Sequence, residues 1–321
     1  MLKHTIILTV VAVTLMAITL FFGYANAKEP DEGGLSGFIA IGGGVDIGKS
    51  SLDDASDDDN DLIYSLSQSA KSETRFEAVL YGELTYTLAE SGTSFTLSSM
   101  ENPIELSVSQ KIGSFGSISL GAAYNEEEVY ADPFQTGVVR GKTDMSAKIF
   151  SIDLDDIMET GIWVGYTHEI IDLDNDLAGL RNADLRREGK VHTISAGAPI
   201  FSTEAHELSA MLSYTDGSFE GKSNDYCGYA LGLSHTYTAG QWELETFAEA
   251  VLRDYDNSHP EFSKTREDRE YTVGSIVTWF DPFGMTDYFI AGMAAYTAVD
   301  SNIKFYDESH AVMELAVGYR F

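Results

Sequence analysis

Charged side chains recur at alternate positions in two separate stretches of this sequence. They are Arg140, Lys142, Asp144 and Lys148 in the first stretch, and Glu243, Glu245, Glu249, Arg253, Asp268 and Glu270 in the second. Because alternate residues of a β-strand point to the same side, each stretch predicts a row of charge on one face. Such rows set ion selectivity when they line a water-filled pore, and we predict that these residues do so. The alternative is a set of salt bridges that partly fill the interior.

Catalysis is another interpretation of the same residues. Glu243 and Glu245 are close enough in sequence to suggest an acid–base pair, but such a pair needs surroundings that drive the two pKa values apart. Neighbouring carboxylates in a water-filled interior have no such surroundings. The histidines are scattered along the sequence, at His168, His192, His206, His235 and His310. We therefore predict that the protein is not an enzyme, has no catalytic residues and uses no cofactor.

Two acidic segments raise the question of a metal site. Their aspartates are Asp57, Asp58, Asp59, Asp172, Asp174 and Asp176. The second group has the alternating oxygens of a calcium-binding loop, but Leu177 stands where that loop needs glycine and Ala183 where it needs a bidentate glutamate. The first group has no fixed ligand spacing. We predict exposed loops that bind divalent ions weakly, and no dedicated metal site.

The end of the chain alternates between an apolar and a mostly polar face. The apolar side consists of Leu315, Val317, Tyr319 and Phe321. A soluble protein gains little by ending on an apolar strand, whereas a transmembrane barrel must pair its last strand with its first to remove both edges. This ending predicts barrel closure and a signal for the barrel assembly machinery. The alternative is an ordinary terminal strand of a soluble sandwich.

The same alternation recurs throughout residues 35–321. It predicts about fourteen strands, with twelve as the alternative, joined by short turns at one end and mostly longer polar loops at the other. Fourteen long strands with their apolar faces inward would enclose more space than side chains can fill, which disfavours a soluble barrel. The predicted fold is all-β: a transmembrane, antiparallel, up-and-down β-barrel whose apolar faces point outward.

The first residues predict export. Lys3 supplies a positive start, residues 6–22 are almost all apolar, and residues 25–27 are the small residues of a cleavage site. We predict a cleaved signal peptide over residues 1–27, a linker over 28–34 and the barrel over 35–321. An uncleaved membrane anchor is the alternative for the first segment. The predicted location is the outer membrane of a Gram-negative bacterium.

The composition limits the partners. With 20 Lys and Arg against 51 Asp and Glu, the formal charge is −31, which opposes binding to nucleic acid. The expected partners are outer-membrane lipid, lipopolysaccharide bridged by divalent ions, the barrel assembly machinery and small solutes. The single cysteine, Cys227, permits no internal disulfide, so a closed hydrogen-bonded ladder must hold the fold instead.

Three segments resemble one protein family. Residues 130–137, Tyr-Ala-Asp-Pro-Phe-Gln-Thr-Gly, together with Arg140 and residues 142–144, are similar to its most specific motif. The loop from Asp58 to Leu66 and residues 185–189, Leu-Arg-Arg-Glu-Gly, are similar to further parts of its pattern. In these residues the chain resembles the bacterial domain of unknown function 2860 family. The resemblance implies an exported outer-membrane barrel, and it implies no activity.

The sequence as a whole predicts a porin-like passive diffusion channel for small hydrophilic solutes. We expect a preference for cations, because the loops and the interior are net acidic. The alternative is a non-conducting barrel that acts as a surface receptor, adhesin or structural protein through its acidic extracellular loops. A third interpretation is an outer-membrane enzyme that acts on lipid or peptide.

Overall fold

The computed structural model describes residues 33–52, 60–100 and 103–321. The predicted signal peptide lies outside the described residues, as do most of the predicted linker and Asp57, Asp58 and Asp59. Within the described residues, fourteen antiparallel strands close into one barrel. The predicted fold is therefore confirmed, and fourteen strands are correct rather than twelve.

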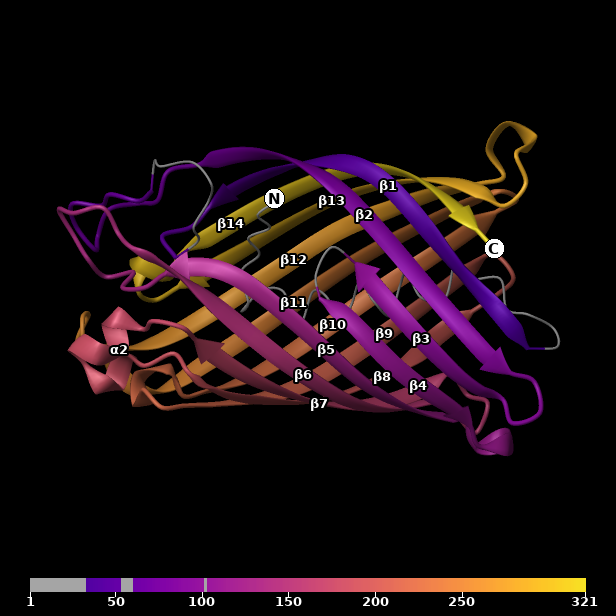
Figure 1. Ribbon diagram of the computed structural model, residues 1–321, viewed down its shortest axis with the longest axis horizontal. Helices are drawn as coiled ribbons and strands as arrows, with labels where there is room; N and C mark the ends of the chain where they lie inside the picture. Colours follow the sequence, from indigo (N-terminus) through magenta and orange to yellow (C-terminus); the bar gives the residue numbers. More distant parts are fainter. Residues whose placement is uncertain (1–32, 53–59, 101–102) are drawn as a thin grey trace.

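The strands follow the chain around the barrel wall (Figure 1). The first seven are β1 (Gly34–Lys49), β2 (Glu73–Leu88), β3 (Thr93–Met100), β4 (Ile104–Lys111), β5 (Ser117–Tyr130), β6 (Lys142–Ile157) and β7 (Ile162–Leu173). The others are β8 (Gly189–Ser202), β9 (His206–Phe219), β10 (Tyr226–Ala239), β11 (Trp242–His259), β12 (Lys264–Phe280), β13 (Tyr288–Ser301) and β14 (Glu308–Arg320). Between them lie the helix α2 (Leu177–Arg181) and 3₁₀ turns at Gly113–Phe115, Ala183–Leu185, Lys222–Asn224, Pro282–Gly284 and Lys304–Tyr306. Among the described residues no helix is long and apolar enough to span a membrane.

The barrel is closed by the pairing of β14 with β1. Their register runs from Phe38 opposite Arg320 to Lys49 opposite Ser309. The terminal residue extends the seam, because the Phe321 amide donates to the Gly37 carbonyl at 3.0 Å and the Gly37 amide donates back at 2.9 Å. Pairing the first strand with the last leaves neither strand with an unpaired edge in hydrocarbon. The closure predicted from the apolar ending is confirmed.

Apolar side chains of the strands point away from the interior. Leu315 and Leu244 are 61% and 40% exposed, and the apolar residues that alternate with polar ones on other strands are exposed in the same way. The opposite face points inward, as shown by the Tyr81 hydroxyl, which donates to the Glu314 carboxylate although β1 separates their strands. This orientation fits a barrel surrounded by hydrocarbon.

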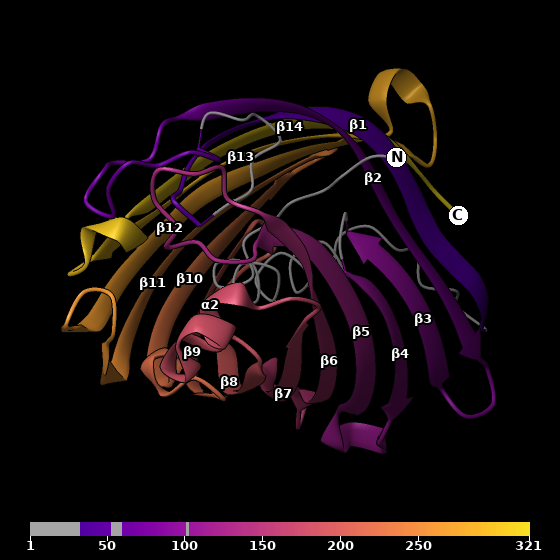
Figure 2. The ribbon, with the colours of Figure 1, turned by 60° about the vertical axis from the view of Figure 1, so that its left-hand side comes forward.

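The two ends of the barrel differ in their connections. At one end the strands are joined by short turns, such as residues 203–205 and 240–241; at the other end lie longer segments, such as residues 131–141 and 174–188. We call these the short-turn end and the long-loop end. The helix α2 and its neighbouring 3₁₀ turn gather at the long-loop end (Figure 2). The connection after β11 lies at the long-loop end but is short, because β11 and β12 continue past a register shift to pair His259 with Lys264.

Two strands are only half as long as their neighbours. β3 and β4 have eight residues each, and they pair with β2 over Tyr81–Leu88 and with β5 over Ser117–Tyr124. They therefore occupy the short-turn end of the wall.

A charge on the outward face should destabilise the barrel. Leu315→Arg places a guanidinium in the middle of the outward apolar face of β14, and it should lower the free energy of unfolding by about 2–4 kcal/mol in lipid vesicles. Urea titration of the refolded barrel measures this change. The control is Asp300→Arg, an exposed position at the long-loop end of β13, where the cost should be about 0–1 kcal/mol. Equal costs at the two positions would contradict the proposed orientation.

Candidate functional site

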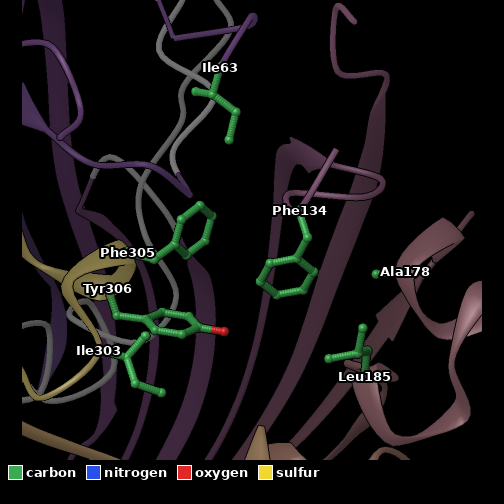
Figure 3. Packing of buried hydrophobic residues seen from close by; sticks show 7 residues of the cluster. All are labelled: Ile63, Phe134, Ala178, Leu185, Ile303, Phe305 and Tyr306. Carbon is green, nitrogen blue, oxygen red and sulfur yellow. The ribbon is translucent and has the colours of Figure 1, made fainter. Parts of the chain in front are cut away.

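Apolar side chains from several connections meet at the long-loop end. The cluster consists of Ile63, Phe134, Ala178, Leu185, Ile303, Phe305 and Tyr306, with Leu52, Leu66 and Phe262 packed against it (Figure 3). These residues come from connections on different sides of the barrel, so the segments must extend inward to reach one another. Burying apolar side chains stabilises this arrangement. We call it the loop cap, and among the described residues it covers the long-loop end of the interior.

Arg140 belongs to the loop cap, so its predicted place in the pore lining is wrong. Its side chain is 1% exposed. The guanidinium donates to the carbonyls of Ser51 at 2.7 Å and Pro133 at 3.0 Å, and also to the Asn60 carbonyl. The same group lies 3.6 Å above the ring of Tyr130. Arg140 therefore ties the β1–β2 connection to the β5–β6 connection, a role that depends on loop geometry rather than on strand alternation.

Two further arginines connect the loops of the cap. Arg181, in α2, pairs with Asp132 at 3.0 Å and also with Glu261. Arg187 pairs with Asp176 at 2.9 Å and donates to the carbonyls of Tyr130 and Ala131. Guanidinium groups suit this role because they hold several acceptors in one plane. The cap is therefore held by ion pairs as well as by apolar packing.

The aspartates predicted as weak ion ligands point to different partners. Asp172 pairs with Lys148 at 2.8 Å on the outer surface, whereas Asp176 pairs with Arg187 inside the cap. Asp174 is exposed, and its backbone amide donates to Asp144. Within the described ranges no three His, Cys, Asp or Glu side chains lie close enough together to hold a metal ion. The calcium-like spacing of this segment therefore does not produce converging ligands.

The other members of the first charged row do not face the interior. Lys142, Asp144 and Lys148 share a face with Phe150 and Ile152, each 48% exposed, so they lie on the outer surface toward the long-loop end of β6. The inward residue Met145 packs instead against a cluster of Ile171, Leu173 and Val191. The prediction was wrong because the inward face of β6 is apolar near the cap. In this part of the strand the polar face therefore points outward and the apolar face points inward.

The second charged row faces the interior. Glu243, Glu245 and Glu249 of β11 alternate with the outward residues Trp242 and Leu244. Farther along, Arg253 forms a salt bridge with Glu270 of β12 at 2.8 Å, and Asp268 pairs with Arg266 at 2.6 Å. The structure thus brings all six residues of this row together. The positive charges of Arg253 and Arg266 lie against the carboxylates of β12.

A cavity of about 980 Å³ occupies the interior next to the β11 carboxylates. Glu243, Glu245, Phe247 and Glu249 line its wall. Its lining continues to the short turns, among them residues 113–117, 155–161 and 203–207. The cavity therefore extends along the interior to the short-turn end. A mixed wall of carboxylates, hydroxyls and a few aromatic rings, among them Phe247 and Trp163, suits polar solutes with positive charge.

Aromatic side chains gather around Arg266 where the inward face of β11 and β12 meets the loop cap, and Tyr306 of the cap is one of them. The Arg266 guanidinium lies 3.6 Å from the ring centre of Tyr306 and 4.6 Å from that of Tyr255, and the Tyr226 ring is 5.4 Å from Tyr255. Tyr226, Tyr255 and Tyr306 are all buried. These contacts were not predicted from the sequence, although Tyr255 and Arg266 continue the inward register of the second charged row. We define Tyr226, Tyr255, Arg266 and Tyr306 as the aromatic layer.

Further inward carboxylates were missed on the opposite wall. They are Glu83 of β2, Glu105 of β4, and Asp153 and Asp155 of β6. Each alternates with outward apolar residues, so the same register argument that identified Glu243 could have found them. They make the interior acidic on more than one side. The acidic character of the interior therefore depends on more strands than the two that were predicted.

Removing the Arg140 guanidinium should loosen the loop cap. Arg140→Met keeps the apolar volume but leaves three buried carbonyls without their donor, at a cost of about 1–3 kcal/mol for each. Limited proteolysis should then cut residues 131–141 faster, while the heat-resistant barrel band on a gel is unchanged. Arg186→Met is the control, because the Arg186 guanidinium forms an exposed pair with Glu220, which contributes little to stability. Equal cleavage of the two variants would contradict the role of Arg140.

The loop cap should also respond to acid through His259. This residue, at the long-loop end of β11, is 1% exposed and shares a hydrogen bond of 2.8 Å with the Tyr306 hydroxyl. Burial, and secondarily Arg266, lowers the pKa of His259 to about 4. The folded cap thus holds neutral histidine, and its stability is fully present above the ordinary pKa of about 6.5 and falls as the pH drops toward 4.

Hydrogen exchange measures this effect. Cap amides in residues 302–307 should exchange faster at pH 4.5 than at pH 7, after correction for the intrinsic rate, and His259→Gln should remove the part of the change that histidine causes. The comparison with the variant separates His259 from carboxylates such as Asp132 and Glu261. A pH response that is identical in the two proteins would contradict the assignment.

Comparison with known proteins gives one family match. The model of the family described as protein of unknown function, DUF2860, matches residues 34–320. No curated protein is similar enough in sequence to count as a relative.

Several solved structures are similar to this chain at low sequence identity. The outer-membrane channel DcaP of Acinetobacter baumannii is 10% identical, with a TM-score of 0.45, and the match covers 93% of this chain and 98% of that one. OmpT, an outer-membrane protein of Vibrio cholerae, is 9% identical over 92% and 100%, with a TM-score of 0.41. An anion-selective porin from Comamonas acidovorans is 12% identical over 90% and 100%, with a TM-score of 0.37. The family match covers almost the entire described barrel, and the chain therefore belongs to the DUF2860 family.

Proposed function

We propose that the protein is a porin-like passive diffusion channel for small hydrophilic solutes, with a preference for cations. The observation that carries the proposal is the acidic cavity, which is lined by Glu243, Glu245 and Glu249 and reaches the short-turn end. Charged walls of one sign favour ions of the opposite sign in a water-filled pore. The arginines near this cavity are paired with carboxylates of β12, which supports an excess of negative charge.

The outer surface supports a location in the outer membrane of a Gram-negative bacterium. Exposed apolar side chains surround the barrel, and aromatic rings meet at the short-turn end, where Trp242 stacks on Trp279 at 5.0 Å and Tyr288 lies 5.1 Å from Tyr319. Aromatic residues of this kind anchor barrels at the membrane–water interface. In this orientation the short turns face the periplasm, and the loop cap faces the outside.

The proposed partners follow from this location. Outer-membrane lipid would contact the apolar belt, and lipopolysaccharide, bridged by divalent ions, would contact the acidic outer loops. Leu315, Val317, Tyr319 and Phe321 lie at the closing seam, where the barrel assembly machinery would recognise them. The acidic charge of the chain opposes nucleic acid as a partner.

The loop cap sets the condition for conduction. Solutes that enter from the periplasm reach the cavity directly, but passage to the outside leads through the aromatic layer and the cap. The channel therefore conducts when these loops separate, and the exposed arginine pairs, such as Arg181 with Glu261, limit how often this happens. Long, packed loops are a common way to restrict outer-membrane barrels.

The same cap favours a second candidate function. A covered long-loop end presents a structured, acidic surface to the outside, which suits a non-conducting receptor, adhesin or structural protein. That function would need the outer loops and not the cavity. A sealed barrel in bilayer recordings would therefore favour it.

Bilayer recordings test the channel. Reversal potentials in a salt gradient should show cation preference. The triple variant Glu243→Gln, Glu245→Gln and Glu249→Gln should lower the cation-to-anion permeability ratio toward unity, by a factor of about ten at most. Asp254→Asn is the matched control, because it removes an outward carboxylate from the same strand and should leave the ratio unchanged. Arg140→Met should raise the frequency of opening. A sealed barrel, or anion preference, would contradict the proposal.

A further inference from the structure

We propose that the cavity binds linear aliphatic polyamines through the carboxylates of β11. Glu243, Glu245 and Glu249 would receive the ammonium groups, and Phe247 would contact the methylene chain between them. The inference rests on the proposed function, because it names the class of solute that the channel selects.

The carboxylates are spaced along one strand at intervals that match a linear ligand. Along a strand that rises about 3.3 Å per residue, Glu245 lies roughly 7 Å from Glu243 and roughly 13 Å from Glu249. The carboxylates therefore form a row along β11, inclined to the pore axis, rather than a cluster. A linear polyamine carries its charges in the same way, on nitrogen atoms separated by short methylene chains. A single small cation could neutralise only one member of this row at a time.

These carboxylates need a counter-charge. Glu245 and Glu249 are only 7% and 8% exposed, and Oε1 of each has no hydrogen-bond partner among the described residues. A buried carboxylate is costly unless a positive group pairs with it. Arg253 also attracts Glu249, but it is shared with Glu270, which it contacts at 2.8 Å, and Arg266 contacts Asp268 at 2.6 Å. A ligand that brings ammonium groups would supply the pairing.

The other charged groups around the cavity also favour a positively charged ligand. Among the described residues of the lining, Lys111 is the one Lys or Arg, and it lies at the short-turn end. The further acidic residues of the lining are Asp155, Asp156, Glu159, Glu204 and Glu207. The path from the short-turn end to Glu249 is thus acidic over its whole length, which draws cations inward.

The arrangement of the side chains suits an organic cation better than a metal ion. Metal sites need several oxygen atoms that converge on one point, and within the described residues no such group of His, Cys, Asp or Glu exists. Phe247 stands between Glu245 and Glu249 on the inward face and packs over Gly274, where a side chain would clash with its ring. An aromatic ring between carboxylates suits ammonium groups and methylene chains together.

Calorimetry on the refolded, full barrel in detergent tests the inference at constant ionic strength. The probes are butylamine, 1,4-diaminobutane and spermidine, with magnesium chloride as the metal probe. Affinity should rise about tenfold or more from the monoamine to the triamine, because each added ammonium group reaches another carboxylate. Glu245→Gln with Glu249→Gln should lower spermidine affinity about tenfold, and Phe247→Ala should lower it by a smaller factor.

Asp254→Asn is the control and should bind spermidine like the unmodified protein. All variants should migrate as heat-resistant barrels, since substitutions facing the interior are tolerated. Equal affinity for butylamine and spermidine, equal affinity for magnesium and spermidine, or an unchanged spermidine affinity in the Glu245 and Glu249 variant would overturn the inference.

Bilayer recordings separate the two proposals. Cation-selective conductance without spermidine binding would overturn the polyamine site alone, whereas binding without conductance would overturn the channel alone.

Discussion

The structure depends on the satisfaction of backbone hydrogen bonds in a closed ladder. A strand in hydrocarbon cannot turn its free edge to water, so the first and last strands must pair with each other. The seam between β1 and β14 achieves this, and Phe321 extends it to the end of the chain. Once the ladder is closed, the alternation of side chains assigns one face to the surroundings and the other to the interior. The polar interior is a consequence of this closure.

The interior is divided along the barrel axis by the chemistry of its inward residues. Near the short turns it is a cavity with carboxylates such as Glu245, and farther along it is crossed by the aromatic layer around Arg266. Beyond that layer the loops pack around Phe134 and Phe305 in the cap. The charged groups have different roles in these parts. The arginines of the cap form ion pairs that hold the loops, whereas the β11 carboxylates line the cavity. A transport path would therefore be controlled at the cap and selective at the cavity.

Strand alternation predicted the barrel, its closure and the inward row of β11. It succeeded for Glu243 and Glu245 because their outward neighbours, Trp242 and Leu244, lie in the apolar belt. It failed for Lys148, which lies above that belt, where the outward face becomes polar and the inward face packs against the cap.

Arg140 was misplaced for a different reason. Its partners, Ser51, Asn60 and Pro133, are brought together by loops that are distant in sequence, and no periodic pattern records their meeting. The cavity's depth and the aromatic layer were likewise set by such tertiary contacts.

Single-cysteine labelling along β11 in lipid vesicles, with Cys227 replaced by serine, tests the orientation on which all of this depends. A charged, water-soluble thiol reagent should modify cysteine at positions 243 and 245 and spare positions 242 and 244; the reverse pattern would contradict the account.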